Sequence, residues 1–308
     1  MEISSVINQM LVLLLLLLLG IVARKTGVMN PQANKALTRI VIILAQSGMI
    51  LSSVMNVEPS LTGLELLALV GISFLTYVIM FLIAVLFTRV MRITPDDRGV
   101  FQFMTMFGNV GFMGFPVIAS LFGDIAVFYA SLFNIPFNLL TYSLGIMMIS
   151  PRSGEKVKIN IKQFINAPLV SSFVAVLIFA LKIPIPAPVA GATELLGDMV
   201  VPAAMLIIGS SLGDMSLKEV FSDWRLYLLA PVKLIAIPVI IWSVLRLFVA
   251  NPLILGIATV LASMPVATNT TMLCIEYKGN EALASKGVFI TTILSVATIP
   301  LTVYLLLI

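Results

Sequence analysis

Residues 107–116 read Phe-Gly-Asn-Val-Gly-Phe-Met-Gly-Phe-Pro and interrupt an apolar segment of the first half of the chain. Residues 263–271 read Ser-Met-Pro-Val-Ala-Thr-Asn-Thr-Thr and interrupt the corresponding segment of the second half. Proline removes a backbone donor and glycine carries an entropic cost, so neither stretch suits a lipid-facing helix. At membrane depth such backbone is tolerated only where it is buried in protein or lines a wet cavity. A matched pair of breaks indicates the binding site of a secondary transporter.

The composition is that of a membrane protein. Of 308 residues, 60% are apolar and only 10% are charged, against about 25% charged residues in a soluble domain. Apolar runs of roughly 20 residues recur along the whole length, and the first is predicted to be an uncleaved membrane helix. We therefore predict an all-α membrane protein with ten transmembrane helices, near 5–23, 36–55, 64–88, 98–121, 125–149, 164–181, 194–213, 225–248, 253–276 and 283–307. The breaks lie in helices 4 and 9.

Several chemistries are excluded. The chain has no histidine and a single cysteine, Cys274, so it has no Ser-His or Cys-His dyad and no internal disulfide. It contains no phosphate-binding P-loop sequence, so it does not hydrolyse ATP by that route. We expect no catalytic residues, no cofactor and no metal. The formal charge of +4 does not predict nucleic-acid binding, because the basic residues flank apolar segments.

The basic residues set the predicted orientation. Of the 18 Lys and Arg residues, 15 lie at one side of the predicted helices, two at the other, and Lys233 within the eighth helix. By the positive-inside rule the side with 15 is cytoplasmic. We therefore expect a multi-pass protein of the plasma membrane with both termini outside.

The two halves resemble each other. Residues 123–126 align with 279–282 at an offset of 156, and the same offset superimposes the two breaks. Near the front, Ile7-Asn8 falls on Ile165-Asn166 at an offset of 158. Five helices is an odd number, so the second copy enters the membrane from the opposite side. The prediction is a 5 + 5 inverted repeat, 1–150 and 163–308, which suits alternating access.

The two breaks are predicted to form the substrate site because they lie deep in the membrane and carry polar residues. Gly108 lies ten residues beyond Arg98, hence ~15 Å into the membrane. Half-helices that start after the breaks point unpaired N–H groups and a positive dipole end inward, which favours an anion. Amides and hydroxyls add hydrogen bonds without charge. The predicted substrate-binding residues here are Gly108, Asn109, Gly111, Pro116, Pro265, Thr268 and Asn269. The alternative is that these residues form kinks and close helix contacts that serve packing alone.

Two further groups are candidates. Lys233 lies eight residues beyond Arg225, about 12 Å deep. It would contribute positive charge to an anion path or bond backbone carbonyls at the crossing, and the alternative is snorkelling toward the headgroups. Asn134 and Asn138 share one helix face and would line the cavity, or act as interhelical polar glue. Gln46 is interpreted as polar glue.

The sequence resembles the auxin efflux carrier family, in its branch of prokaryotic organic-acid permeases, and distantly the bile acid:sodium symporters. The resemblance rests on Gly-Asn at 108–109 with Gly114 and Pro116, on Met-Pro at 264–265, on Lys233 with Pro238, and on the Thr- and Ser-rich pattern of 291–300. It implies broken, crossing helices 4 and 9, a dimerising scaffold of helices 1, 2, 6 and 7, and a transport domain of helices 3–5 and 8–10 that moves like an elevator. It also implies that Asn109 contacts a substrate carboxylate and that Pro116 and Pro265 are the crossover prolines.

The resulting hypothesis is a homodimeric carrier of small organic anions, secondary active or facilitative, acting in efflux or as a permease. Proton or sodium coupling stays open. The ninth helix has Ala-Thr-Asn at 267–269 where plant members commonly carry a second proline, which favours a mono- or dicarboxylate such as malonate over auxin. The alternatives are an ion channel and an intramembrane enzyme without histidine chemistry, built on a Ser-Lys or aspartyl pair.

Overall fold

The computed structural model describes residues 3–55, 63–150, 166–213 and 223–308, and all its named elements are helical. The predicted all-α fold is therefore confirmed for these residues. Six of the described helical spans are long and apolar enough to cross a membrane, and three shorter apolar helices accompany them. Ten membrane crossings and the inverted repeat stay predictions. The predicted boundary between the repeats falls in 151–165, outside the described residues.

The helices begin where the sequence supplies caps. Asn30 Oδ1 accepts from the N–H of Ala33 at 2.8 Å at the start of α2 (Pro31–Ile40). Asparagines cap α9 (Ala167–Leu181), α15 (Pro252–Ala262) and α17 (Glu281–Leu307) in the same way. A side-chain oxygen at this position satisfies one of the N–H groups that the first turn leaves unpaired. Proline stands in the first turn of α2, α9 and α15, where its missing donor costs nothing.

Contacts divide the chain into two compact units. The first comprises residues 1–69, 111–132 and 165–215. Its helices are α1 (Ile3–Lys25), α2, α3 (Gln46–Met55), α6 (Phe115–Phe122), α9, α10 (Ala187–Asp198), α11 (Val200–Gly213) and the start of α7 (Asp124–Leu140). The assignment of helices to a scaffold and a transport domain stays a prediction.

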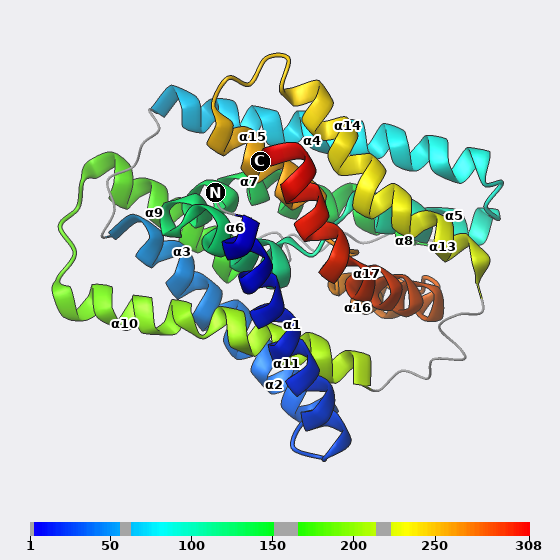
Figure 1. The fold of residues 1–308 in the computed structure, drawn as a ribbon, viewed down its shortest axis with the longest axis horizontal. Coiled ribbons are helices and arrows are strands. Elements are labelled where there is room, and N and C mark those ends of the chain that lie inside the picture. The colour runs from blue at the N-terminus through cyan, green and yellow to red at the C-terminus, as the bar shows by residue number, and fades with distance from the viewer. Residues whose placement is uncertain (1–2, 56–62, 151–165, 214–222) are drawn as a thin grey trace. The chain divides into compact units, whose positions relative to one another are not determined.

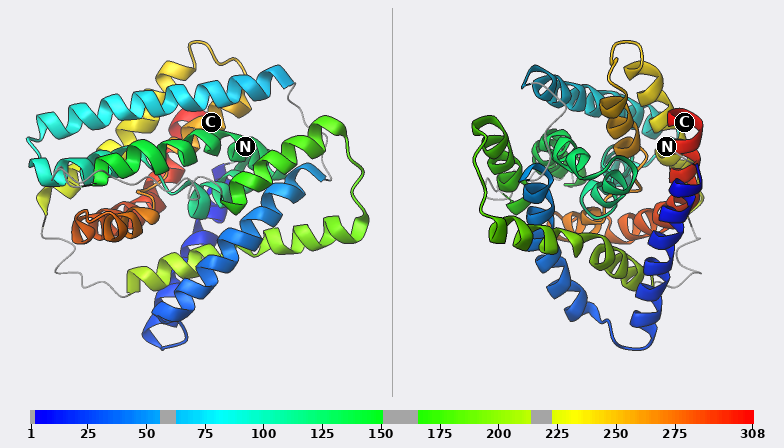
Figure 2. Two further views of the ribbon diagram at one scale, coloured as in Figure 1. Left: turned by 180° about the vertical axis from the view of Figure 1, so that it is seen from behind. Right: turned by 60° about the vertical axis from the view of Figure 1, so that its left-hand side comes forward.

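In the first unit, α1 and α11 run side by side, as do α3 and α10 (Figures 1 and 2). Glycines permit the contact of α1 with α11. A Cβ on Gly20 would lie 2.5 Å from the carbonyl oxygen of Leu206, and a Cβ on Gly209 would overlap the carbonyl oxygen of Leu17. Small residues at such points let helix backbones approach closely.

The second unit comprises residues 70–110, 133–164 and 216–308. Its helices are most of α4 (Gly63–Val90), α5 (Pro95–Met106), the end of α7, α8 (Ile146–Ile149), α13 (Trp224–Pro231), α14 (Ile237–Leu245), α15, α16 (Asn269–Glu276) and α17. Aromatic rings fill part of its interior. Tyr77 of α4 lies 6.0 Å from Phe107 and 6.3 Å from Phe137 of α7, centroid to centroid, and Phe107 lies 5.7 Å from Phe137.

Wide π-helical turns lie within three of the described spans, η1 (Val41–Ala45), η3 (Thr141–Gly145) and η5 (Val232–Ala236), and a fourth, η2 (Val110–Gly114), begins the segment that continues into α6. Such turns are uncommon and occur frequently at functional sites. In η5 the turn lies between Pro231 and Pro238 and contains Lys233. Proline loosens the helical ladder by removing a donor, which accounts for the wide turn at this place.

Candidate functional site

The two sequence breaks lie side by side in the second unit and bond to each other. One is the stretch 107–109 after α5, the other the stretch 263–268 between α15 and α16, and Gly108 faces Val266 in an antiparallel bridge. Asn109 N–H donates to the carbonyl of Pro265 at 2.7 Å, and Ala267 N–H donates to the carbonyl of Phe107 at 3.2 Å. We call this arrangement the crossing. It gives hydrogen-bond partners to backbone groups that no helix satisfies.

The crossing is shorter than the sequence stretches that predicted it. Gly111 and Gly114 lie in η2, and Pro116 lies in the first turn of α6, so the chain is helical again from Val110. Proline in a first turn leaves helix geometry intact, because that turn does not use its N–H. Gly111 and Pro116 therefore sit in helices of the first unit rather than in the crossing.

A threonine of α17 supports the crossing. Val266 N–H donates to Thr291 Oγ1 at 3.0 Å, and the Thr291 hydroxyl donates to the carbonyl of Gly287 at 2.7 Å. Both Val266 and Thr291 are fully buried. The threonine thus supplies the acceptor that the broken helix lacks. Sequence reasoning cited Thr291 only as part of a family pattern. A buried Thr facing a Pro-containing break is the signal that could have identified its role.

Gly108 lets the two breaks and Lys233 approach one another. A Cβ on Gly108 would lie 3.2 Å from Met264 Cβ, 3.3 Å from the carbonyl oxygen of Met264 and 3.5 Å from Lys233 Nζ. Lys233 is 0% exposed, so its side chain points into the packed interior beside Gly108 rather than out to the surface. A hydrogen is therefore the only side chain that fits here without displacing a neighbour.

Buried hydrogen-bonding atoms at the crossing have no partner. Among the described residues none bonds to Lys233 Nζ, Asn109 Nδ2 or Asn269 Oδ1. Buried polar atoms without partners are rare, since each costs about 1–3 kcal/mol. The first two are donors. Asn269 opens α16, and its half-buried neighbour Thr268 makes no side-chain cap bond. The two donors and the start of α16 suit a ligand with negatively charged acceptor oxygens.

The end of α7 packs beside Phe107, through the aromatic contacts of Phe137. Asn134 and Asn138 lie in this stretch and are both buried. Asn138 Nδ2 donates to the carbonyl of Asn134 at 3.0 Å, so this amide binds its own helix. Asn134 Oδ1 has no partner within the described residues. Of the pair, Asn134 is thus the one with an atom left for another group.

Gln46 of the first unit, interpreted from the sequence as polar glue, lies next to Gly111. It is buried, a Cβ on Gly111 would lie 2.8 Å from its Nε2, and that nitrogen has no hydrogen-bond partner among the described residues. The polar-glue role of Gln46 stays a prediction.

Residues 5–304 match the family model described as "Membrane transport protein". An "Uncharacterized transporter" of Methanothermobacter thermautotrophicus is 27% identical over 296 residues, 96% of each chain. One of Methanocaldococcus jannaschii is 26% identical over 306 residues, 97% of this chain and 98% of its own. The "Putative malonate transporter" of Rhizobium meliloti is 28% identical over 249 residues, 78% of this chain and 76% of its own.

Proposed function

Because the chain belongs to the membrane transport protein family, we propose that it carries small organic anions, mono- or dicarboxylates, across the membrane. Membership confirms the family predicted from the sequence. The chain is a multi-pass membrane transporter and not an enzyme, so the alternative of an intramembrane enzyme with a Ser-Lys or aspartyl pair is set aside. The ion-channel alternative is addressed by the transport assay below.

One observation carries the proposal for the anion. Lys233 Nζ and Asn109 Nδ2 are buried donors without partners, beside a crossing whose backbone bonds are already made. An anion next to the lysine favours its charged form and supplies the missing acceptors. The alternative role of Lys233, bonding backbone carbonyls at the crossing, is not favoured, since Nζ has no such partner among the described residues.

The substrate class follows from the same chemistry. A carboxylate has two oxygens that accept from an amide and an ammonium at once. The name of the Rhizobium meliloti relative, a "Putative malonate transporter", points to the same class and supports a dicarboxylate as the first candidate to test. In this proposal Asn109, Lys233 and the start of α16 bind the carboxylate. Gly108 and Pro265 shape the crossing, while Asn134, Asn138, Thr268 and Asn269 line it. Gly111 and Pro116 lie at the start of the helical segment that follows the crossing and position it.

The mechanism is alternating access by an elevator motion, in a homodimer in the plasma membrane. The two crossing bonds support an inverted repeat, because an offset of 158 residues converts each bond into the other: 109 to 265 becomes 267 to 107. Symmetry of this kind is common in secondary transporters. The proposal covers transport in either direction, with a proton, with sodium or without a coupling ion. For outward transport without a coupling ion, the membrane potential alone supplies ~2.3 kcal/mol per 100 mV for each negative charge.

The test uses purified protein in proteoliposomes with a panel of labelled mono- and dicarboxylates. Lys233→Met is expected to lower carboxylate affinity by roughly 30-fold or more, since breaking a buried charge pair costs about 2–5 kcal/mol. Asn109→Ala is expected to lower it by about 10- to 150-fold, from about 1.5–3 kcal/mol. Lys35→Met is the matched control, because Lys35 is exposed in the first unit.

Thermal unfolding separates binding from a structural role. With no partner for Nζ in the described structure, Lys233→Met should leave the melting temperature unchanged or raise it. Lower stability in this variant would mean that Lys233 holds the fold. Wild-type transport in both Lys233→Met and Asn109→Ala would show that the crossing is not the binding site. Single-channel currents in place of saturable, substrate-selective flux would favour the ion channel.

A further inference from the structure

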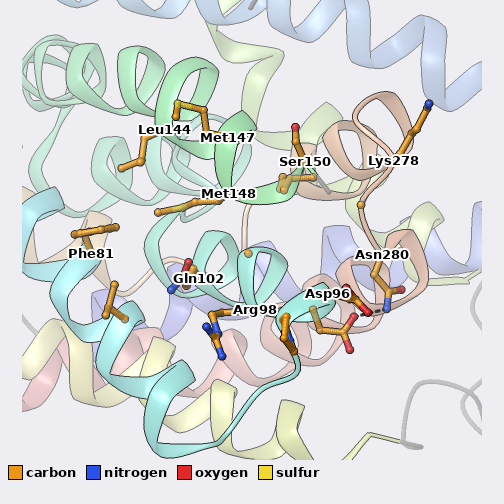
Figure 3. Close-up of a pocket in the computed structure, with 16 residues that line it drawn as sticks. Phe81, Asp96, Arg98, Gln102, Leu144, Met147, Met148, Ser150, Lys278 and Asn280 are labelled. Carbon is orange, nitrogen blue, oxygen red and sulfur yellow. Dashed lines mark hydrogen bonds between the residues drawn. The ribbon is translucent and has the colours of Figure 1, made fainter. Parts of the chain in front are cut away.

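A cavity separate from the crossing lies at the end of the second unit where α5 begins. Its volume is about 560 Å³, within the usual range for small-ligand pockets. Its walls come from the end of α4, the start of α5, α8 and the turn before α17 (Figure 3). The crossing residues are not among those that line it. Of the charged residues here, the sequence reasoning used the basic ones to predict orientation and Arg98 also to measure depth.

The two sides of this cavity differ in chemistry. Figure 3 shows the apolar side chains of Phe81, Leu144 and Met147 at one side and Ser150, Lys278 and Asn280 at the other. The apolar side reaches the outer surface, since Met147 is 61% exposed. A pocket with an apolar end at an exposed apolar surface and a polar end matches an amphipathic ligand.

The cavity also lies at the depth of lipid headgroups. Val85 and Phe81 stand five and nine residues before the end of α4, hence ~7–13 Å below it. Arg89 lies in the last turn of that helix, and Arg98 lines the cavity from α5. Basic residues at such a level mark the membrane–water interface on the predicted cytoplasmic side.

Acidic and basic side chains line the cavity in equal number. Its polar wall holds two carboxylates, Asp96 and Asp97, and two cationic groups, Arg98 and Lys278. Asp97 accepts from Asn280 Nδ2 at 2.8 Å and from the Thr94 hydroxyl at 3.3 Å. Asp96 is exposed, and Arg98 has an Nε atom without a partner among the described residues. A guanidinium recognises a phosphate, and a carboxylate recognises an ammonium.

We propose that this cavity binds a phospholipid with a zwitterionic ethanolamine headgroup, its phosphate at Arg98, its ammonium at Asp96, and an acyl chain along Phe81, Leu144 and Met147. A purely anionic headgroup would meet the two carboxylates as well as the two cations. A soluble phosphodiester would leave the apolar side empty. The inference does not depend on which substrate the transporter carries, because it concerns different residues.

The experiment is native mass spectrometry of purified, delipidated protein after addition of vesicles of phosphatidylethanolamine, phosphatidylglycerol or phosphatidylcholine. The expected result is retention of one phosphatidylethanolamine per chain, at least tenfold above the other two lipids. Arg98→Gln should reduce that retention at least tenfold. Arg89→Gln should not, because Arg89 is exposed on α4 and does not line the cavity.

A second pair of variants tests the apolar side. Leu144→Trp fills the cavity and should also reduce retention at least tenfold, whereas Leu139→Trp places the same ring on an exposed position outside it and should not. Equal retention of phosphatidylglycerol would overturn the zwitterionic assignment. Displacement of the lipid by equimolar soluble glycerophosphoethanolamine would show that the site takes a free phosphodiester. Undiminished retention in folded Arg98→Gln or Leu144→Trp would overturn the proposed site.

Discussion

Replacement of Gly108 by alanine tests the close approach at the crossing. The backbone of Gly108 lies outside the left-handed region, so alanine is not strained there and any cost arises from contacts. The new methyl would lie 3.2 and 3.3 Å from the Cβ and the carbonyl oxygen of Met264, a few tenths of an ångström inside normal contact. The adjacent Pro265 carbonyl accepts the Asn109 N–H, so the Met264 backbone has little freedom to withdraw. Overpacking of this kind costs about 1–3 kcal/mol.

Gly71→Ala is the matched control, because Gly71 lies inside α4 and a Cβ there meets nothing within 4 Å. It should stabilise the protein by about 0.5–1 kcal/mol through helix propensity. In Gly108→Ala, the lower conformational entropy of the unfolded chain stabilises the protein by at most about 1 kcal/mol. Thermal unfolding should therefore rank Gly108→Ala below Gly71→Ala, and carboxylate transport should fall about tenfold in the former alone, equivalent to about 1.4 kcal/mol. Equal melting temperatures with wild-type transport in both variants would refute the packing of the crossing described above.

Two further predictions concern the support of the second unit. Thr291→Val removes the acceptor of the buried Val266 N–H and should destabilise the protein by about 1–3 kcal/mol. Thr298→Val removes a hydroxyl without a partner among the described residues and should be neutral or stabilising in thermal unfolding. Gly99→Ala would drive a methyl into a backbone carbonyl of α8, whereas Gly287→Ala would place it against the flexible end of a methionine. Gly99→Ala should therefore lower the melting temperature more than Gly287→Ala. The reverse order would contradict the assigned contacts.

The positions of the helices could be predicted closely from the sequence, because the relevant signals are local. Apolar runs, asparagine caps and first-turn prolines all act within a few residues of the helix ends they set. The predicted segment 64–88 corresponds to α4 at Gly63–Val90, and 283–307 to α17 at Glu281–Leu307. The extent of the breaks was less predictable. Gly111 and Pro116 read as helix breakers, yet both are compatible with the beginning of a helix and lie in one.

The direction of a side chain was harder to predict than its depth. Counting residues from Arg225 gave the depth of Lys233, but not whether it faces lipid or protein. An α-helix turns 100° per residue, and a π-turn holds an extra residue, so each of these wide turns changes the face of every later residue. Lys233 lies within such a turn, and periodicity alone therefore left two orientations open. The close approach of Lys233 to Gly108, more than 100 residues away in sequence, decides between them.

The pairing of the two breaks follows from the requirement that buried backbone groups be satisfied. Backbone groups that lack helical bonds, at a depth where water is scarce, need acceptors and donors from elsewhere in the protein. The partner that fits best is another short extended stretch, and Phe107, Asn109, Pro265 and Ala267 exchange their backbone bonds in this way. Because these backbone groups satisfy one another and Thr291 bonds the Val266 N–H, the side chains of Asn109 and Lys233 are not needed for these bonds. The buried donors of Asn109 and Lys233 are left without partners, and a carboxylate that binds and leaves can take this place without breaking the crossing.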